Sequence, residues 1–250
     1  MIISHRHKFI YLKARKVAGT SVEVALAQHC GEGDIVTPVG AFNPNWDEEE
    51  YSHPGEKWQG YGRHLPLIPV RRRLGQKLWD AYFKFAVTRN PWDLVVSQYH
   101  WATRSGYGDA YERAVRRSLK RFWTYPLKVR KNFRTLGTSL ARTFLKMDVV
   151  KFDFFVRHML RYYPLNDRFY FDRSGSVGLD FLIRYENLQD DYTSVCARIG
   201  IPTSQLPSLK TRTRSERRHY STYYDDRTRE LVRKAYHRHI DQFGYRFGGP

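Results

Sequence analysis

The sequence has few cysteines and lacks long apolar runs. Its 250 residues include only two cysteines, Cys30 and Cys196, which are too few for a disulfide-stabilised scaffold and are not spaced as metal ligands. The first residues contain no apolar core of a secretory signal, and no stretch is long enough to span a bilayer. These absences argue against a disulfide-rich secreted domain and a membrane-spanning protein, and they predict a cytoplasmic protein.

Negative charge is also scarce relative to positive charge. The chain has 43 Lys and Arg against 25 Asp and Glu, a formal net charge of +18. Such a field attracts polyanions, including nucleic acid, anionic lipid, acidic polysaccharide and phosphorylated cofactors, without choosing among them. With 41% hydrophobic residues and no internal repeat, the composition is that of a globular protein. The length fits a single α/β domain over 1–250, with room for one insertion.

Strand and helix patterns alternate along the chain. Alternating apolar residues predict a strand over 83–88, and similar short runs predict strands over 8–12 and 180–185. Helices are expected at about 20–28, from Pro91 onward, at about 190–199 and from about Asp226 to Gly244. This alternation predicts an α/β fold with a parallel sheet flanked by helices.

The middle of the chain, approximately 104–173, breaks this alternation. It holds 17 Lys and Arg against 6 Asp and Glu, with aromatic residues such as Trp123 and Tyr125 between them. We interpret it as a basic, mostly helical insertion that carries a substrate-binding region. The alternative is a solvated basic helical face with a local core.

A strand, a loop with small residues and a helix follow one another around Lys13–Ser21. The amino end of a helix presents unpaired N–H groups and partial positive charge, which suit a phosphate. Thr20 and Ser21 add hydroxyl donors, and Lys16 adds a mobile cation. The alternative is an ordinary strand–helix turn with a capping threonine. The loop is not a Walker A motif, because Gly19 is followed by Thr20 rather than by lysine, and this disfavours ATP γ-phosphoryl transfer.

A second candidate phosphate site follows the strand over 83–88. Arg89 leaves the carboxyl end of that strand, where open α/β sheets bind ligands, and Ser97 lies about two helical turns further on. A guanidinium and a hydroxyl would clamp a phosphate dianion, while Asn90 and Pro91 suit the start of the helix. Alternatively, Arg89 pairs with a carboxylate and Ser97 only caps. Two such sites on adjacent strand–helix units predict one ligand with two separated phosphate groups.

Four segments together are similar to the sulfotransferase family. Lys16–Ser21 resembles that family's 5′-phosphosulfate loop, and Arg89–Asp93 with Ser97 resembles its 3′-phosphate motif. Phe181–Leu188 is similar to a family strand that ends in an aromatic–Glu–Asn turn, and Tyr220–Phe247 is similar to the end of many bacterial carbohydrate-type members. The similarity covers roughly the first and last thirds of the chain. It implies a P-loop NTPase-like parallel sheet and a sulfotransferase that depends on 3′-phosphoadenosine 5′-phosphosulfate (PAPS).

The resemblance also implies roles for these residues. Lys16 would donate to the leaving-group oxygen, the loop amides and hydroxyls would hold the 5′-phosphate, and the 3′-phosphate motif would hold the 3′-phosphate with a cation near Arg217 or Arg218. The implied donor-binding residues are therefore Lys16, Val17, Ala18, Gly19, Thr20, Ser21, Arg89, Ser97 and Arg217. The co-substrate would be PAPS, and no metal is expected. The acceptor would be a hydroxyl, with a carbohydrate implied by the family and an anionic one favoured by the basic insertion.

Lys16 is the first predicted catalytic residue. The general base is a separate group, for which the sequence offers two candidates. His64 lies where several carbohydrate sulfotransferases place an acceptor-side histidine, and an ordinary histidine pKa suits proton removal near neutrality. Asp34 is the alternative, because some members use a carboxylate in that region. The non-functional interpretation of His64 is a solvated loop residue.

Two other functions are compatible with the composition. A small-molecule or nucleotide kinase could use the same architecture, although the Walker A lysine is missing. A nucleic-acid-binding module could use the basic, aromatic middle segment, although no recognised nucleic-acid motif accompanies it. Turnover without a metal would argue against the kinase, and salt-sensitive binding without turnover would favour the nucleic-acid module.

Overall fold

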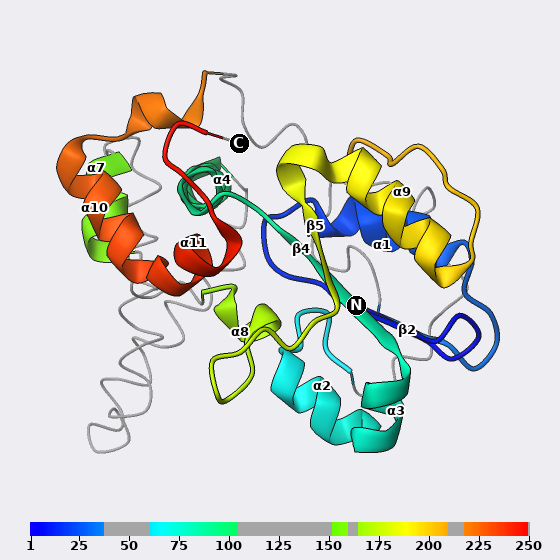
Figure 1. The fold of residues 1–250 in the computed structure, drawn as a ribbon. Coiled ribbons are helices and arrows are strands. Elements are labelled where there is room, and N and C mark those ends of the chain that lie inside the picture. The colour runs from blue at the N-terminus through cyan, green and yellow to red at the C-terminus, as the bar shows by residue number, and fades with distance from the viewer. Residues whose placement is uncertain (38–60, 105–151, 160–164, 210–217, 250) are drawn as a thin grey trace, which may run out of the picture. The chain divides into compact units, whose positions relative to one another are not determined.

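The computed structural model describes residues 1–37, 61–104, 152–159, 165–209 and 218–249 (Figure 1). Within this part of the chain the fold has two compact units. The first consists of Met1–Arg89 and Asn166–Lys210, and the second of Asn90–Leu165 and Thr211–Pro250. The boundary therefore falls between Arg89 and Asn90, inside the segment that resembles a 3′-phosphate motif.

A sheet forms the centre of the first unit. In the described residues it has five strands in the order β3-β1-β2-β4-β5. They are β1 (Ile2–Ser4), β2 (Phe9–Leu12), β3 (Ile35–Val36), β4 (Phe83–Thr88) and β5 (Phe181–Arg184). β4 pairs in parallel with β2 and β5, whereas β1 pairs antiparallel with β2 and β3. All but β1 therefore run in the same direction. The predicted α/β class is confirmed, whereas the sheet is mostly parallel and not wholly parallel as predicted.

The sequence predicted β2, β4 and β5 but not β1 or β3. The first strand expected from the sequence was 8–12, yet Ile2 and Ile3 already form β1 and are fully buried there. β1 and β3 have only three and two residues, too few for an alternating pattern to show. β4 has the predicted bounds, but Ala86 and Thr88 are buried as well as Phe85. Both faces of this central strand are therefore covered, as is usual for parallel strands.

Helices flank this sheet in the first unit. They are α1 (Gly19–Ala27), α2 (Leu67–Leu74), α3 (Gln76–Ala81), α8 (Asp167–Tyr170) and α9 (Leu188–Ile199), with the 3₁₀ turn η5 (Tyr185–Asn187). α9 packs along β5, and α2 packs against α3 and α8. Figure 1 shows α9 beside β5, and the α2–α3 pair at the lower end of the unit. The predicted helices after β2 and β5 are confirmed, with bounds that differ by one or two residues.

The described part of the second unit is helical. It contains α4 (Pro91–Arg104), α7 (Phe152–Phe154), the π-helical turn η3 (Phe155–Met159), the 3₁₀ turn η7 (Tyr220–Tyr223), α10 (Asp226–Ala235) and α11 (His237–Phe243). α10 contacts both α4 and η3. The sequence predicted one helix from about Asp226 to Gly244, but it is interrupted at Tyr236, where φ is −112° and ψ is 20°.

Most of the proposed insertion at approximately 104–173 lies outside the described residues. Of its described parts, α7 and η3 belong to the second unit, whereas α8 belongs to the first. Its interpretation as a mostly helical acceptor-binding region stays a prediction. In the described ranges, no helix is both long and apolar enough to cross a membrane.

Candidate functional site

The loop between β2 and α1 has an uncommon backbone conformation. Lys16 has a φ of 60° and Ala18 a φ of 57°, both in the left-handed region that residues other than glycine seldom occupy. Each such residue costs about 1–2 kcal/mol, so the surrounding contacts must hold the loop in this shape. Left-handed residues in a turn aim successive N–H groups toward one point and form a nest for anions. The backbone of this loop is therefore suited to a phosphate.

The backbone amides of the loop point to the same ligand. Within the described residues, no protein acceptor is bonded to the N–H groups of Val17, Ala18, Gly19 and Thr20. The amides of Ser21 and Val22 instead donate to the Ala18 carbonyl, at 3.0 and 3.4 Å, so only the hydroxyl of Ser21 is left as a candidate contact. Buried N–H groups are almost always paired in proteins. An anion at this point would satisfy several of them at once.

The carbonyl groups of the loop are bound by protein donors. The Lys13 carbonyl accepts from His64 Nδ1 (2.8 Å), the Arg15 carbonyl from Asn166 Nδ2 (2.8 Å), the Lys16 carbonyl from Arg89 Nη1 (3.0 Å) and the Gly19 carbonyl from the Tyr11 hydroxyl (3.0 Å). Carbonyl oxygens repel anions, and these hydrogen bonds turn the carbonyl oxygens of the loop toward protein donors. Bonded carbonyls and unbonded amides in one loop give its backbone an orientation that suits an anion.

Gly19 lies at the first position of α1, where a side chain would have little room. A Cβ there would lie 3.0 Å from the Tyr11 hydroxyl, 3.1 Å from Lys13 Cγ and 3.4 Å from the Ala14 carbonyl. The start of the helix therefore packs tightly against the end of β2. This close approach explains the glycine by lack of space and not by its own φ.

His64 lies beside the start of the loop. Its Nδ1 carries the proton that is donated to the Lys13 carbonyl at 2.8 Å, so Nε2 carries the lone pair. Burial lowers the pKa of His64 to about 3, against the opposing effect of the Lys13 hydrogen bond, and the positive charge of Arg15 lowers it further. The ordinary histidine pKa expected from the sequence is therefore wrong for His64. The imidazole is neutral at physiological pH, and Nε2 is a weakly basic proton acceptor next to the loop.

Asp34 lies at the opposite end of β2. Ser4 faces Phe9, the first residue of β2, whereas the loop to α1 follows the last residue of that strand. The Asp34 carboxylate accepts hydrogen bonds at this first end from the Ser4 hydroxyl (3.0 Å) and from the amides of His5 (2.6 Å), Arg6 (3.2 Å) and Gly31 (3.0 Å). It stabilises the β1–β2 turn and the approach to β3. This location disfavours Asp34 as a base acting at the loop.

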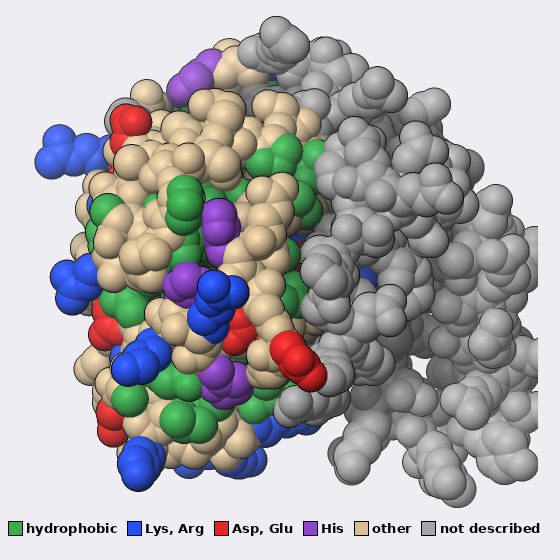
Figure 2. All heavy atoms as spheres, turned by 90° about the vertical axis from the view of Figure 1, so that its right-hand side faces the viewer, with side chains coloured by type: hydrophobic (Ala, Val, Ile, Leu, Met, Phe, Trp, Pro, Cys, Tyr) green, Lys and Arg blue, Asp and Glu red, His purple; other side chains and the backbone are tan. Residues whose placement is uncertain are grey.

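The β1–β2 turn also belongs to a different surface. It lies on the right-hand side of Figure 1, and Figure 2, which views that side, shows histidine side chains with lysine or arginine beside them on the described surface. His5 and His7 belong to this turn, whereas His64 binds the Lys13 carbonyl beyond the other end of β2.

Arg89 joins the end of β4 to the loop. Its guanidinium donates to the Lys16 carbonyl at 3.0 Å and stacks on the Tyr185 ring, with 3.9 Å between Cζ and the ring centroid. The residue is only 7% exposed. The phosphate clamp predicted at this position stays a prediction; the structure shows Arg89 bound to the backbone of the loop between β2 and α1.

One protein family accounts for almost the whole chain. The model of the sulfotransferase family matches residues 1–246. The chain belongs to the sulfotransferase family. An uncharacterized protein of Archaeoglobus fulgidus is 31% identical to it over 138 residues, which are 55% of this chain and 84% of that protein. No solved structure matches the chain.

Family membership confirms the resemblance to the sulfotransferase family, whereas the carbohydrate type stays a prediction. The match also includes the middle of the chain, which the sequence analysis could not assign to the family. A sulfotransferase moves a sulfuryl group, so the chain is a transferase. The described residues contain no group of His, Cys, Asp and Glu side chains arranged to hold a metal ion.

Other residues that the resemblance assigned to the sulfotransferase donor site lie in the second unit. Ser97 is on α4 and is partly exposed. Arg217 lies outside the described residues. The next residue, Arg218, stacks its guanidinium on the Tyr223 ring, with 4.0 Å from Cζ to the ring centroid. These residues stay predicted contacts of the donor.

Asn90 ties the start of α4 to the C-terminal part of the sulfotransferase chain. Its Oδ1 accepts from the Trp92 amide at 3.1 Å, which confirms the predicted helix start. Its Nδ2 lies within hydrogen-bonding distance of the Tyr220 hydroxyl (3.1 Å) and the carbonyls of Arg246 (3.0 Å) and Gly249 (3.2 Å). Sequence analysis recognised the cap but not these contacts, which no local pattern reveals.

A buried ion pair fixes the start of the loop to α1. The Lys13 ammonium contacts the Glu23 carboxylate, and these side chains are 4% and 0% exposed. Burial alone would raise the pKa of Glu23, but the ammonium groups of Met1 and Lys13 lower it to about 2. Because Lys13 pairs with Glu23, Lys16 rather than Lys13 is the candidate cation for a ligand of the loop.

Proposed function

We propose that this sulfotransferase transfers the sulfuryl group of PAPS to a hydroxyl of a carbohydrate acceptor. The observation that carries the donor assignment is the loop in which Val17–Thr20 leave their amides unbonded while side chains bind the neighbouring carbonyls. The 5′-phosphosulfate is an anion that such a loop can bind without a metal.

In this proposal, different residues of the chain bind different parts of PAPS. The loop amides and the hydroxyls of Thr20 and Ser21 bind the 5′-phosphate. The family resemblance assigns the 3′-phosphate to Arg89 and Ser97, with a cation near Arg217. Lys16 donates a hydrogen bond to the oxygen that links phosphorus and sulfur, where negative charge grows as the bond to sulfur breaks.

Sulfuryl transfer is an in-line displacement in which the acceptor oxygen forms a bond to sulfur while the bond between sulfur and the phosphate oxygen breaks. The acceptor hydroxyl loses its proton to His64 Nε2 in this step, and adenosine 3′,5′-bisphosphate leaves. His64 suits this role because its Nδ1 proton is bonded to the Lys13 carbonyl and its tautomer is thereby set. The negative charge of the bound donor raises the basicity of the imidazole at the moment of transfer.

The carbohydrate acceptor rests on two observations about the sequence. Tyr220–Phe247 resembles the end of bacterial carbohydrate-type members, and the net charge of +18 favours an anionic acceptor. A panel of neutral and anionic glycans, incubated with labelled PAPS and examined by mass spectrometry, tests this part. Transfer to neutral glycans alone would contradict the anionic preference.

A melting experiment tests the donor assignment. At a concentration of one hundred times its Kd, a ligand of the native state adds about 2.7 kcal/mol, which for a chain of this size raises the Tm by roughly 5–10 °C. We expect adenosine 3′,5′-bisphosphate to produce such a rise without added metal. Stabilisation by ATP with Mg²⁺ and none by the bisphosphate would refute the donor and favour the kinase.

A further inference from the structure

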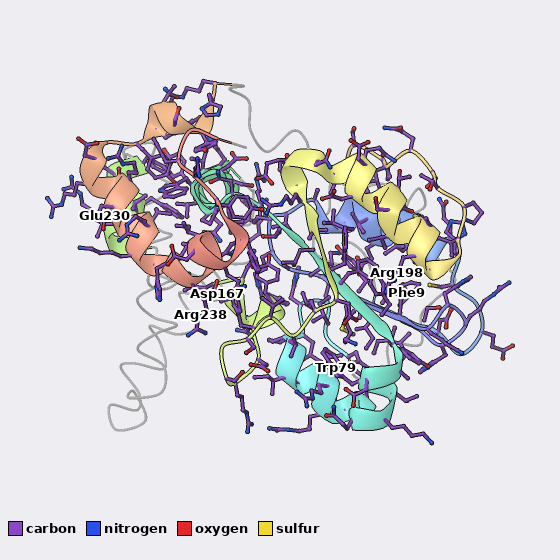
Figure 3. The ribbon with its side chains drawn as sticks, viewed as in Figure 1. Phe9, Trp79, Asp167, Arg198, Glu230 and Arg238 are labelled. Carbon is purple, nitrogen blue, oxygen red and sulfur yellow. The ribbon has the colours of Figure 1, made fainter. Side chains whose placement is uncertain are left out.

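Asn166 is a buried residue that joins a distant part of the chain to the phosphate loop. Its side chain is 0% exposed, and it precedes α8, whose first residue, Asp167, is labelled in Figure 3. Asn166 Oδ1 accepts from the Arg15 amide at 3.1 Å, and Asn166 Nδ2 donates to the Arg15 carbonyl at 2.8 Å. Both ends of the side-chain amide thus bind the backbone of one loop residue.

These two bonds fix the peptide planes on either side of Arg15. In a trans peptide the carbonyl of one residue and the N–H of the next point in opposite directions. The Arg15 carbonyl points to Asn166, so the Lys16 N–H points away from it. The plane of this peptide, together with the φ of 60° at Lys16, sets the direction in which the Lys16 side chain leaves the backbone.

We propose that Asn166 is a positioning residue for the 5′-phosphate and for Lys16. It holds the peptide between Arg15 and Lys16 so that the following amides face the anion and the lysine reaches the leaving-group oxygen. This inference rests on the proposed function. It assigns a role in donor binding to the end of the 104–173 segment, which the sequence analysis associated with the acceptor.

Replacing Asn166 should change the Tm and the nucleotide affinities differently, depending on whether its role is purely structural or positioning. Loss of a buried clamp that only supports the fold lowers the Tm and affects every ligand alike. Loss of a clamp that aims the 5′-phosphate loop affects ligands that carry a 5′-phosphate. Adenosine 3′,5′-bisphosphate and adenosine 3′-monophosphate differ in this one group, and the ratio of their affinities separates the two roles.

The first unit offers a matched control. Gln189 Nε2 donates to the Ser204 carbonyl at 3.1 Å, and Gln189 Oε1 accepts from the Leu206 amide at 3.0 Å. It therefore clamps a different segment with the same kind of side-chain amide. Gln189→Ala should lower the Tm and leave the affinity ratio unchanged.

Calorimetric titration of both nucleotides into the variants tests the proposal. We expect Asn166→Ala to weaken adenosine 3′,5′-bisphosphate by about tenfold or more, the equivalent of about 1.4 kcal/mol, and to change adenosine 3′-monophosphate by less than about twofold. The kcat at saturating PAPS should also fall, because Lys16 is no longer aimed. Equal losses for both nucleotides, or no loss for either, would overturn the proposal.

Asn166→Asp is the second variant, with nearly the same size and no cavity. It keeps an acceptor for the Arg15 amide but has no donor for the Arg15 carbonyl, so it should show the same selective loss. It carries the test alone if Asn166→Ala does not fold. Full affinity of Asn166→Asp for the bisphosphate would refute the proposal. If the wild-type protein binds neither nucleotide, the proposed function itself is wrong and this inference falls with it.

Discussion

Replacing His64 by asparagine would separate its two proposed tasks. The asparagine amide nitrogen lies close to the position of the imidazole Nδ1 and can still donate to the Lys13 carbonyl, but it has no counterpart of Nε2. Loss of a general base reduces turnover by about 10²–10⁴. We therefore expect His64→Asn to lose roughly that factor in kcat, with an affinity for adenosine 3′,5′-bisphosphate close to that of the wild type.

His64→Ala is the matched comparison, because it removes both tasks. The bond to the Lys13 carbonyl is worth about 0.5–1.5 kcal/mol net. Its loss should loosen the loop and weaken bisphosphate binding by about two- to tenfold, in addition to the loss of turnover. Steady-state kinetics and calorimetry on the three proteins give both quantities. Near-normal turnover by His64→Asn would show that His64 only supports the loop.

The pH behaviour of His64 follows from its surroundings. Burial lowers its pKa to about 3, so folding keeps the imidazole neutral while the unfolded chain binds a proton below about pH 6.5. The unfolded state then carries more protons, and the free energy of unfolding should fall as the pH decreases from that value. His64→Asn should lose this part of the pH dependence in urea unfolding. An NMR titration of the His64 ring near pH 6.5 would contradict the burial argument.

The other predictions concern the loop. Lys16→Ala should cut kcat by about a hundredfold or more while bisphosphate affinity falls less; equal losses in both would assign Lys16 to binding alone. Arg89→Ala should cost about 2 kcal/mol in bisphosphate binding. It should also weaken adenosine 5′-phosphosulfate, because Arg89 holds the Lys16 carbonyl, and unchanged 5′-phosphosulfate binding would refute that task. Gly19→Ala should lower both Tm and bisphosphate affinity, because its Cβ would press against Tyr11 and Lys13; a calorimetric scan that shows no change would refute the steric argument.

The segment from β4 into α4 could be predicted from the sequence because all its determinants are local. Alternating residues give the strand, and Asn90 followed by Pro91 gives the helix start. The strand–loop–helix unit around Lys13–Ser21 could be predicted for the same reason, since a strand, small residues and a helix follow one another. The residues that bind its carbonyls were not equally visible. Asn166 lies 151 residues from the residue it binds, and side-chain contacts with backbone over such separations have no sequence period.

The two base candidates illustrate the same limit. His64 lies 51 residues after Lys13, whose carbonyl it binds, and such spacing does not say which end of a sheet a residue reaches. The short strands β1 and β3 decide this. Their antiparallel pairing brings Asp34 to the start of β2, whereas His64 reaches the end. Because β1 and β3 were too short to predict, the sequence could not separate the candidates.

The left-handed conformations of Lys16 and Ala18 have a consequence for the thermodynamics of binding. A loop made flexible by glycine must be ordered when the ligand arrives, and that ordering opposes binding by its conformational entropy. Here the uncommon conformation belongs to residues with side chains, and the surrounding contacts hold it before any ligand binds. The free-energy cost of this loop conformation is therefore part of folding and not of ligand binding. Donor binding by this loop should therefore show a small entropic penalty, and replacing Ala18 by glycine should make that penalty larger.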